Sequence, residues 1–317
     1  MKIIGILAVI VLLVLAGLWL FTLFTAKRVE AGLPPEGRFV EVMGARLHVI
    51  EAGKGPTILL IHGLGGVARN FNYQVLGELA TQFRVVAVDR PGSGYSSRHR
   101  RSSARLDVQA DVMAGLIQAL DLRRPLIVGH SLGGAVALAT ALRHPTQVSG
   151  LALVAPLTHL PQGVSKAFAG LTVRQSWLRR LIAWTLATPM TILNRDKVMN
   201  IVFGPEAAPE DFGVRGGGFL GLRPSQFIAS SRDLNALEDV LPMMQQRYPT
   251  LQLPISILYG RQDRILDPAE QGQALKDIVP QAELTLVDGG HMLPITQPEV
   301  TTEFIRSSHD KVAAAPH

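Results

Sequence analysis

The stretch "LIVGHSLGGAVALATAL", residues 126–142, decides the fold, because a sharp turn containing a serine joins an apolar run to a helical pattern. Ser131 lies at this turn, with Gly129 two residues before it and Gly133 two residues after it. In the pattern Gly-x-Ser-x-Gly the serine adopts a strained conformation that lifts its hydroxyl off the sheet edge, and the chain passes too closely for side chains at the glycines. The helix that follows directs N–H groups toward any developing anion. The pattern therefore predicts a nucleophile rather than a helix cap.

Apolar strands and helical patterns alternate along most of the chain. We expect strands at 46–53, 56–63, 84–89, 125–130 and 148–156, and helices at 72–83, 106–122 and 132–144. The alternation stops at Pro156 and resumes with strands at 253–260 and 282–289 and helices near 268–277 and 298–308. The tail after about Ser308 is expected to be frayed. This alternation predicts an α/β protein with a mostly parallel sheet covered by helices.

Two further segments supply an acid and a base. "YGRQDRILDP" places Asp263 just after the strand 253–260, and "LVDGGHMLPITQPE" places His291 just after the strand 282–289. A serine hydroxyl becomes a good nucleophile when a base takes its proton, and the base needs an acid that holds its tautomer. The chain order Ser131, Asp263, His291 is that of the triad in enzymes with a Gly-x-Ser-x-Gly turn. We therefore predict that these three residues are catalytic.

Three nearby polar residues have simpler explanations. Asp267 precedes Pro268 and is expected to cap the helix that follows. Asp288 precedes a pair of glycines and is expected to be a turn residue. His130 adjoins Ser131 but points away from it if the turn has the predicted geometry, so it is expected to be structural.

The loop "HGLGG", residues 62–66, completes a pattern that resembles the α/β-hydrolase superfamily in its lipase/esterase-like branch. The resemblance extends from about residue 38 to about residue 306. It implies that the backbone N–H groups of Leu64 and Leu132 form the oxyanion hole. It also implies a structural role for the turn "DRPGSGYS" (89–96) and a helical cap formed by the insertion 157–242.

The resemblance also narrows the chemistry. Epoxide hydrolases and haloalkane dehalogenases of this fold carry aspartate at the turn, which Ser131 excludes. Hydrolases that cleave carbon–carbon bonds commonly show asparagine before the serine, where this chain has His130. Ester hydrolysis is therefore the expected reaction, and neither a metal nor a cofactor is required for it. No metal-ligand spacing such as His-Glu-x-x-His is present.

The composition points away from nucleic acid. The formal net charge is +6, but the basic residues are scattered and no aromatic-interleaved basic stripe accompanies them. An anionic membrane surface is the better partner for this charge. The absence of cysteine excludes disulfides, thiolate metal ligands and a cysteine nucleophile.

The N-terminal segment predicts a membrane anchor. Ile3–Ala26 contains no charge, and as a helix it would extend roughly 36 Å, enough for a hydrocarbon core of about 30 Å. The run is longer than the apolar part of a secretory signal, and Lys27 and Arg28 follow it directly. We expect a single uncleaved pass through a bacterial inner membrane, followed by a short stiff linker at 27–37. Flanking charges are balanced, but long domains translocate largely regardless of charge, so the catalytic domain is expected in the periplasm.

A basic amphipathic helix is expected within the cap, in "VRQSWLRRLIAWTLATPM" (173–190). One of its faces collects the apolar residues Trp177, Leu178, Leu181, Ile182 and Leu186. Two interpretations stay open for this face. It packs onto the core of the protein, or it lies on or near lipid.

These features predict a membrane-anchored serine hydrolase that cleaves carboxylic esters, with lipid or fatty-acyl esters as substrates, resembling bacterial single-pass membrane lipases and phospholipases A. The expected division is an anchor (1–28), a core in two parts (29–156 and 243–317) and a cap (157–242). A carbon–carbon bond hydrolase, an acyltransferase and a non-catalytic ligand-binding protein of the same fold are the alternatives. The sequence does not indicate the acyl chain length, the head group or the oligomeric state.

Overall fold

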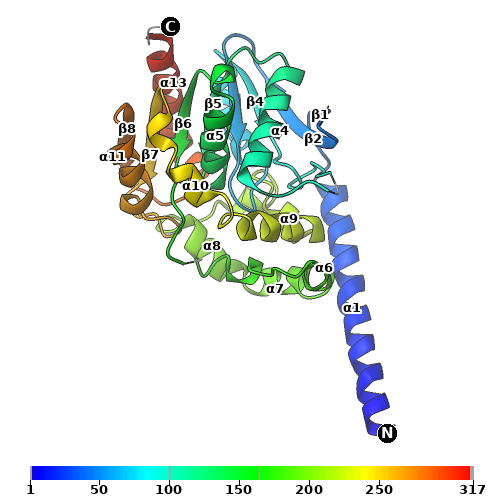
Figure 1. The fold of residues 1–317 in the computed structure, drawn as a ribbon. Helices are drawn as coiled ribbons and strands as arrows, with labels where there is room; N and C mark the ends of the chain where they lie inside the picture. The colour runs from blue at the N-terminus through cyan, green and yellow to red at the C-terminus, as the bar shows by residue number, and fades with distance from the viewer. Residues whose placement is uncertain (1, 100, 164, 315–317) are drawn as a thin grey trace.

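A computed structural model describes residues 2–99, 101–163 and 165–314 of the chain. Its centre is an eight-stranded sheet with the strand order β1-β2-β4-β3-β5-β6-β7-β8 (Figure 1). The strands are β1 (Arg38–Val42), β2 (Ala45–Ala52), β3 (Thr57–Ile61), β4 (Arg84–Val88), β5 (Leu126–His130), β6 (Gly150–Val154), β7 (Ile255–Gly260) and β8 (Ala282–Val287). β2 pairs antiparallel with β1 and β4, and all other neighbours are parallel. The prediction of a mostly parallel α/β sheet is confirmed.

The strand β1 was not predicted from the sequence. At the edge of the sheet, its residues RFVEV are exposed or half-buried up to the last one, and only Val42 is buried. The central strands β5 and β6 are buried along their whole length and therefore read as continuous apolar runs. An edge strand that is half exposed carries no such run, which is why this one gave no signal.

Helices cover both faces of the sheet, each with its own apolar core. One face carries α4 (Leu106–Ala119), α5 (Leu132–Arg143), α10 (Leu241–Gln245) and α11 (Ala274–Ile278). The other carries α2 (Arg69–Asn72), α3 (Val75–Leu79), α12 (Leu293–Thr296) and α13 (Pro298–Ala314). The short helical turns η1 (Pro145–Gln147), η5 (Tyr248–Thr250) and η6 (Ala269–Gln273) lie in the segments that connect these helices and strands. This arrangement is the α/β-hydrolase fold that the motifs predicted.

Two helix predictions were wrong in extent. The helix expected at 72–83 is divided into α2 and α3, because the backbone at Gln74 (φ −156°) interrupts the helical hydrogen bonding. The tail expected to fray after Ser308 remains helical to Ala314. It stays ordered because it packs on the sheet: the His309 ring lies 4.8 Å from the Phe83 ring.

The insertion between β6 and β7 is helical, as predicted. It contains η2 (Ala169–Leu171), α6 (Ser176–Trp184), α7 (Ala187–Leu193), α8 (Arg195–Phe203), η3 (Glu210–Gly213), η4 (Gly218–Leu222) and α9 (Pro224–Asn235). In the described part of this segment, 157–163 and 165–242, no residue is in a strand. Figure 1 shows α7 and α8 along the lower edge of the domain, with α9 between them and the sheet.

The N-terminal helix α1 (Lys2–Gly32) is the one described helix that is long and apolar enough to cross a membrane. The linker predicted at 27–37 is wrong over its first half, because α1 continues to Gly32 and only the residues after it leave the helix. Leu33 explains the difference: it is buried against Val67 and Leu220 and thereby holds the end of the helix on the domain. The helix then extends away from the domain beyond α6 and α7 (Figure 1).

Candidate active site

Ser131 stands at the turn between β5 and α5 in the conformation that the Gly-x-Ser-x-Gly pattern requires. Its backbone angles are φ 54° and ψ −123°, which side-chain-bearing residues rarely adopt. A Cβ atom at Gly129 would lie 2.5 Å from the Gly133 carbonyl oxygen, and one at Gly133 would lie 2.1 Å from the Ile61 carbonyl oxygen. Both glycines are therefore required by close backbone approach, as expected from the sequence.

Asp263 and His291 lie together at the same sheet edge, after β7 and β8. The Asp263 Oδ2 atom is 2.7 Å from His291 Nδ1, and both side chains are almost completely buried. The other carboxylate oxygen, Oδ1, accepts hydrogen bonds from the N–H groups of Ile265 (2.8 Å) and Leu266 (3.0 Å). These bonds hold the carboxylate still, and it in turn orients the imidazole so that Nε2 is left for a substrate or a hydroxyl.

Asp267 and Asp288, the other two aspartates near the predicted acid, have different partners. The Asp267 carboxylate accepts a hydrogen bond from the Ala269 N–H (2.7 Å), two residues on, just before the following helical turn, whose N-cap residue is Pro268. Asp288 is largely exposed and lies 3.6 Å from the guanidinium of Arg261. Within the described residues neither carboxylate is hydrogen-bonded to His291, so Asp263 alone orients this histidine.

His130 connects the turn to the histidine loop. Its Nε2 atom lies 3.0 Å from the His291 carbonyl oxygen, and the two rings are 5.0 Å apart. Burial, followed by the neighbouring His291, lowers the pKa of His130 to about 3, so its ring is neutral at physiological pH. Over the part of the chain that the structure describes, no hydrogen bond joins the Ser131 hydroxyl to His291. Such bonds commonly tighten only when substrate is bound.

Two backbone N–H groups beside Ser131 have no acceptor. Neither the N–H of Leu64 nor that of Leu132 donates a hydrogen bond to any described residue. The loop of residues 62–66 approaches the turn so closely that a Cβ atom at Gly63 would lie 2.9 Å from Ser131 Cβ. Free donors this close to a hydroxyl nucleophile are suited to bind an oxyanion.

The loop 62–66 is held by Arg90, which follows β4. Arg90 donates from Nε to the His62 carbonyl (2.9 Å) and from Nη2 to the Gly63 carbonyl (3.0 Å). The Arg90 backbone N–H donates to His62 Nε2 (2.9 Å), so the proton of this ring must be on Nδ1, which donates to the Gly63 carbonyl (2.8 Å). Burial and the charge of Arg90 lower the pKa of His62 to about 4, which keeps this ring neutral.

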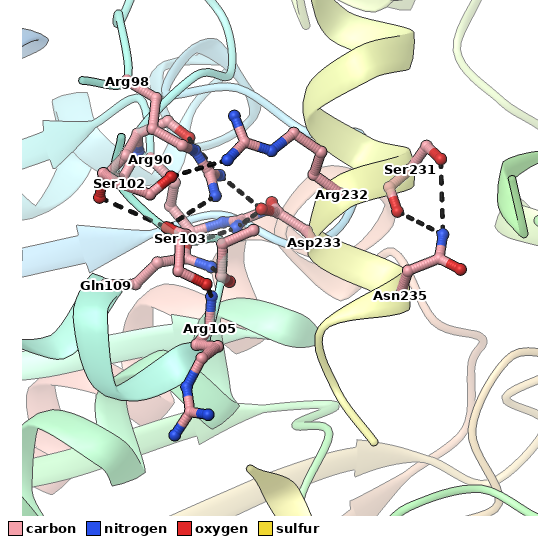
Figure 2. A network of polar contacts seen from close by, with 12 residues as sticks. Arg90, Arg98, Ser102, Ser103, Arg105, Gln109, Ser231, Arg232, Asp233 and Asn235 are labelled. Carbon is pink, nitrogen blue, oxygen red and sulfur yellow. Dashed lines mark hydrogen bonds and ion pairs between the residues drawn. The ribbon is translucent and has the colours of Figure 1, made fainter. Parts of the chain in front are cut away.

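Arg90 is in turn bound by the cap. The Asp233 carboxylate on α9 accepts from Arg90 Nη1 (2.6 Å) and from Arg98 Nη2 (2.5 Å), as Figure 2 shows, and Asp233 is completely buried. About two helical turns earlier on the same helix, Gln226 donates to the Gly66 carbonyl (3.1 Å). A buried polar face of α9 therefore lies over the loop that carries Leu64.

Sequence reasoning missed Arg90, Gln226 and Asp233. It assigned the turn 89–96 a structural role, which agrees with its contacts, but did not connect this turn to the cap. The available signal was weak: Gln226, Ser230 and Asp233 have the spacing of one helical face and are all buried. Polar residues at this spacing are normally read as the solvent face of a helix.

The described residues contain no group of three or more histidine, aspartate or glutamate side chains placed to hold a metal ion.

The strand order and the turn that carries Ser131 define an α/β hydrolase. Residues 56–298 match the family model described as alpha/beta hydrolase fold, and the chain belongs to this family.

Three similar proteins show the range of the family. An uncharacterised protein of Mycobacterium tuberculosis is 30% identical over 82% of this chain and 77% of its own length. A 2-hydroxy-6-oxo-2,4-heptadienoate hydrolase of Pseudomonas putida is 28% identical over 88% of this chain and 96% of its own length. Among solved structures, a membrane phospholipase A, described as a bacterial virulence factor, superposes with a TM-score of 0.71 at 25% identity. That match covers 99% of this chain and 97% of the other.

The Asp233–Arg90 pair generates the first prediction. Asp233→Asn leaves two buried guanidinium groups without their counter-ion, so we expect the free energy of unfolding to fall by about 3–5 kcal/mol. Displacement of the loop 62–66 should also lower kcat of the hydrolase by roughly 10- to 100-fold with little change in KM. Denaturation in detergent and steady-state kinetics measure both quantities.

The matched control is Glu238→Gln, because Glu238 is also a cap carboxylate paired with an arginine, Arg174, but both side chains are exposed. Exposed pairs contribute little, so this variant should resemble the wild type. Equal effects of the two substitutions would contradict the role assigned to the buried pair.

Proposed function

We propose that this protein is a membrane-anchored serine hydrolase that cleaves carboxylic esters, with lipid or fatty-acyl esters as its substrates. The observation that carries the proposal is the Asp263–His291 pair at the sheet edge where Ser131 and two acceptor-free N–H groups also stand. Each group has the chemistry that acyl transfer needs, and the arrangement requires no metal or cofactor.

The proposed reaction has two halves. Ser131 Oγ attacks the ester carbonyl while His291 Nε2 takes its proton, and the developing oxyanion is bound by the N–H groups of Leu64 and Leu132. The C–O bond to the alcohol breaks, and His291 passes its proton to the leaving alkoxide. Water then attacks the acyl-enzyme with His291 again as the base, which releases the acid and restores the Ser131 hydroxyl. Asp263 stabilises the imidazolium in both halves.

His291 is the histidine best suited to be the base. The neighbouring rings of His62 and His130 are kept neutral by burial and are engaged with backbone groups. A protein in which three histidines near the serine were charged would repel the proton that the base must accept.

The choice of lipid esters is supported by the membrane helix and by the similarity to the membrane phospholipase A, which extends over α1 as well as the hydrolase core. α1 packs on the cap through buried Thr22 and Ala26, an arrangement that favours a retained anchor over a cleaved signal. We place the anchor in a bacterial inner membrane and the catalytic domain in the periplasm, on the charge and length arguments given above.

A carbon–carbon bond hydrolase is the second candidate, because the similar protein of Pseudomonas putida is a 2-hydroxy-6-oxo-2,4-heptadienoate hydrolase. The same serine and histidine can support both reactions. A panel of p-nitrophenyl esters of increasing chain length, tested beside that dienoate, separates the two candidates. Faster turnover of the dienoate than of every ester would favour the second candidate.

Replacing the proposed nucleophile gives the second prediction. Ser131→Ala should lower kcat for ester hydrolysis on the order of a million-fold. It should also abolish labelling by a fluorophosphonate, which reacts with activated serines. Ser149→Ala, at the opposite edge of the sheet, is the control and should keep both properties. Retention of more than a few per cent of the activity in Ser131→Ala would exclude this mechanism, and an unlabelled, inactive but folded wild type would favour a ligand-binding protein.

The identity of the acid gives the third prediction. Asp263→Asn should lower kcat by roughly 10⁴-fold, because an amide in place of the carboxylate favours the wrong tautomer of His291. Asp267→Asn should change the rate little, because asparagine caps helices about as well as aspartate. Steady-state rates on one soluble ester decide between them, and a larger loss in Asp267→Asn would mean that the acid is misassigned.

A further inference from the structure

We propose that the cap itself enters the membrane: the outer surface of α6 and α7 lies in the interface of the bilayer that α1 crosses. This inference rests on the proposed anchor but not on the identity of the substrate. The surface consists of the exposed side chains Trp177, Leu181, Trp184, Leu186, Met190 and Leu193, called the cap surface below.

The helix α6 buries an arginine and exposes apolar side chains, which is the reverse of a cap helix that packs onto a core. Its arginine Arg179 is buried and donates to Ser231 Oγ (2.9 Å) and to the Val173 carbonyl (2.6 Å). Trp177, by contrast, is 67% exposed, and Leu193 at the end of α7 is 78% exposed. Packing of the apolar face onto the core is therefore wrong for Trp177, Leu181 and Leu186, which are exposed, whereas Leu178 and Ile182 are half-buried. Large apolar side chains gathered and exposed on two neighbouring helices mark a contact with a partner or a membrane.

The cap surface is continuous with the membrane helix. α1 contacts α6, α7 and η4, and the Trp19 ring on α1 lies 6.5 Å from the Trp184 ring on α6. Farther along, Glu30 is 3.4 Å from the guanidinium of Arg223 at the start of α9. The anchor and the cap therefore form one packed body, and the depth of one determines the depth of the other.

The length of α1 shows how deep that body lies. Buried or half-buried residues first appear on α1 at Leu15 and recur at Leu18, Thr22 and Ala26. If the whole cap stayed outside the lipid, only residues 3–14 would be free to span, and about 12 residues reach roughly 18 Å. A hydrocarbon core of about 30 Å needs the remaining apolar residues as well. The part of α1 that contacts the cap must then lie in lipid, together with the cap surface beside it.

The distribution of tryptophan and of charge agrees with this depth. The chain has three tryptophans. Trp19 and Trp184 pair where α1 meets the cap surface, and Trp177 is exposed on that same surface. Tryptophan prefers the boundary between headgroups and acyl chains. The exposed basic residues Lys27 on α1 and Arg180 on α6 are available to anionic headgroups next to this boundary.

Depth-dependent fluorescence quenching tests the proposal on the full chain in phosphatidylcholine/phosphatidylglycerol vesicles. The variant Trp19→Phe/Trp184→Phe leaves Trp177 as its single tryptophan. We expect acyl chains brominated near the headgroup to quench it more strongly than chains brominated near their ends, with aqueous iodide quenching it weakly. The control reporter is Val300→Trp in a chain without the three native tryptophans, because Val300 is exposed on α13, away from the cap.

Equal quenching of Trp177 and of the control reporter by iodide would overturn the proposal. Shielding of Trp177 from both iodide and brominated lipid would overturn it too, in favour of a protein that covers the cap surface. Neither result would contradict the proposed function, provided that ester hydrolysis still depends on Ser131. Conversely, if the protein proved not to hydrolyse esters, the quenching result would still hold.

A charge introduced into the cap surface tests whether this surface contributes to activity on membranes. Leu193→Glu should lower the rate on phospholipid presented in vesicles by about tenfold or more, because a carboxylate resists transfer into lipid. Turnover of a short, water-soluble ester should stay unchanged, since Leu193 is exposed on α7 and is not one of the groups proposed to act on the ester. Val300→Glu adds the same charge at an exposed position outside the surface and should leave both rates unchanged. Equal loss on both substrates in Leu193→Glu, or none on either, would overturn the membrane role of the cap surface.

Discussion

The buried ion pair between Asp233 and Arg90 connects the cap helix α9 to the turn after β4. A carboxylate and a guanidinium that are both completely buried cannot be separated without leaving an uncompensated charge in a region of low polarity. The cap helix α9 and the turn after β4 are therefore fixed relative to each other. Because Arg90 also binds the carbonyls of His62 and Gly63, the same constraint orients the peptide groups leading to Leu64. The cap therefore helps to hold the loop that carries Leu64.

Three histidines lie around Ser131, and each has different hydrogen-bond partners. His62 is held neutral, with its proton on Nδ1, by a backbone donor on one side and a backbone acceptor on the other. His130 is neutral through burial and contacts the His291 carbonyl. Of the three, only His291 is hydrogen-bonded to a carboxylate, that of Asp263. Three residues of one type therefore differ in function because their hydrogen-bond partners differ.

The sequence predicted the central part of this arrangement because its causes are local. The turn at Ser131 depends on glycines two residues away, and Asp263 and His291 each follow a strand whose apolar run is visible in the sequence. The Arg90–Asp233 pair joins residues 143 positions apart, and no local pattern announces it. Periodicity showed that α6 has an apolar face but not whether that face meets protein, water or lipid. The end of α1 was misjudged for a similar reason, since Leu33 is buried by Val67 and Leu220, far away in the chain.

Because α1 stays helical to Gly32, the proposed membrane anchor would act on the hydrolase domain in a different way from a flexibly linked anchor. With a flexible linker the hydrolase domain would tumble near the membrane, so the lipid substrates that we propose would meet Ser131 at random orientations. A helix that continues to Gly32 and packs along the cap removes this freedom, because rotation of the domain would break the buried contacts of Thr22, Ala26 and Leu33. The entropy cost of orienting the domain then arises once, when the protein folds, rather than at each encounter with a lipid. The elements that contact α1 belong to the same cap whose helix α9 holds the loop 62–66, so the orientation set by α1 extends to the loop beside Ser131.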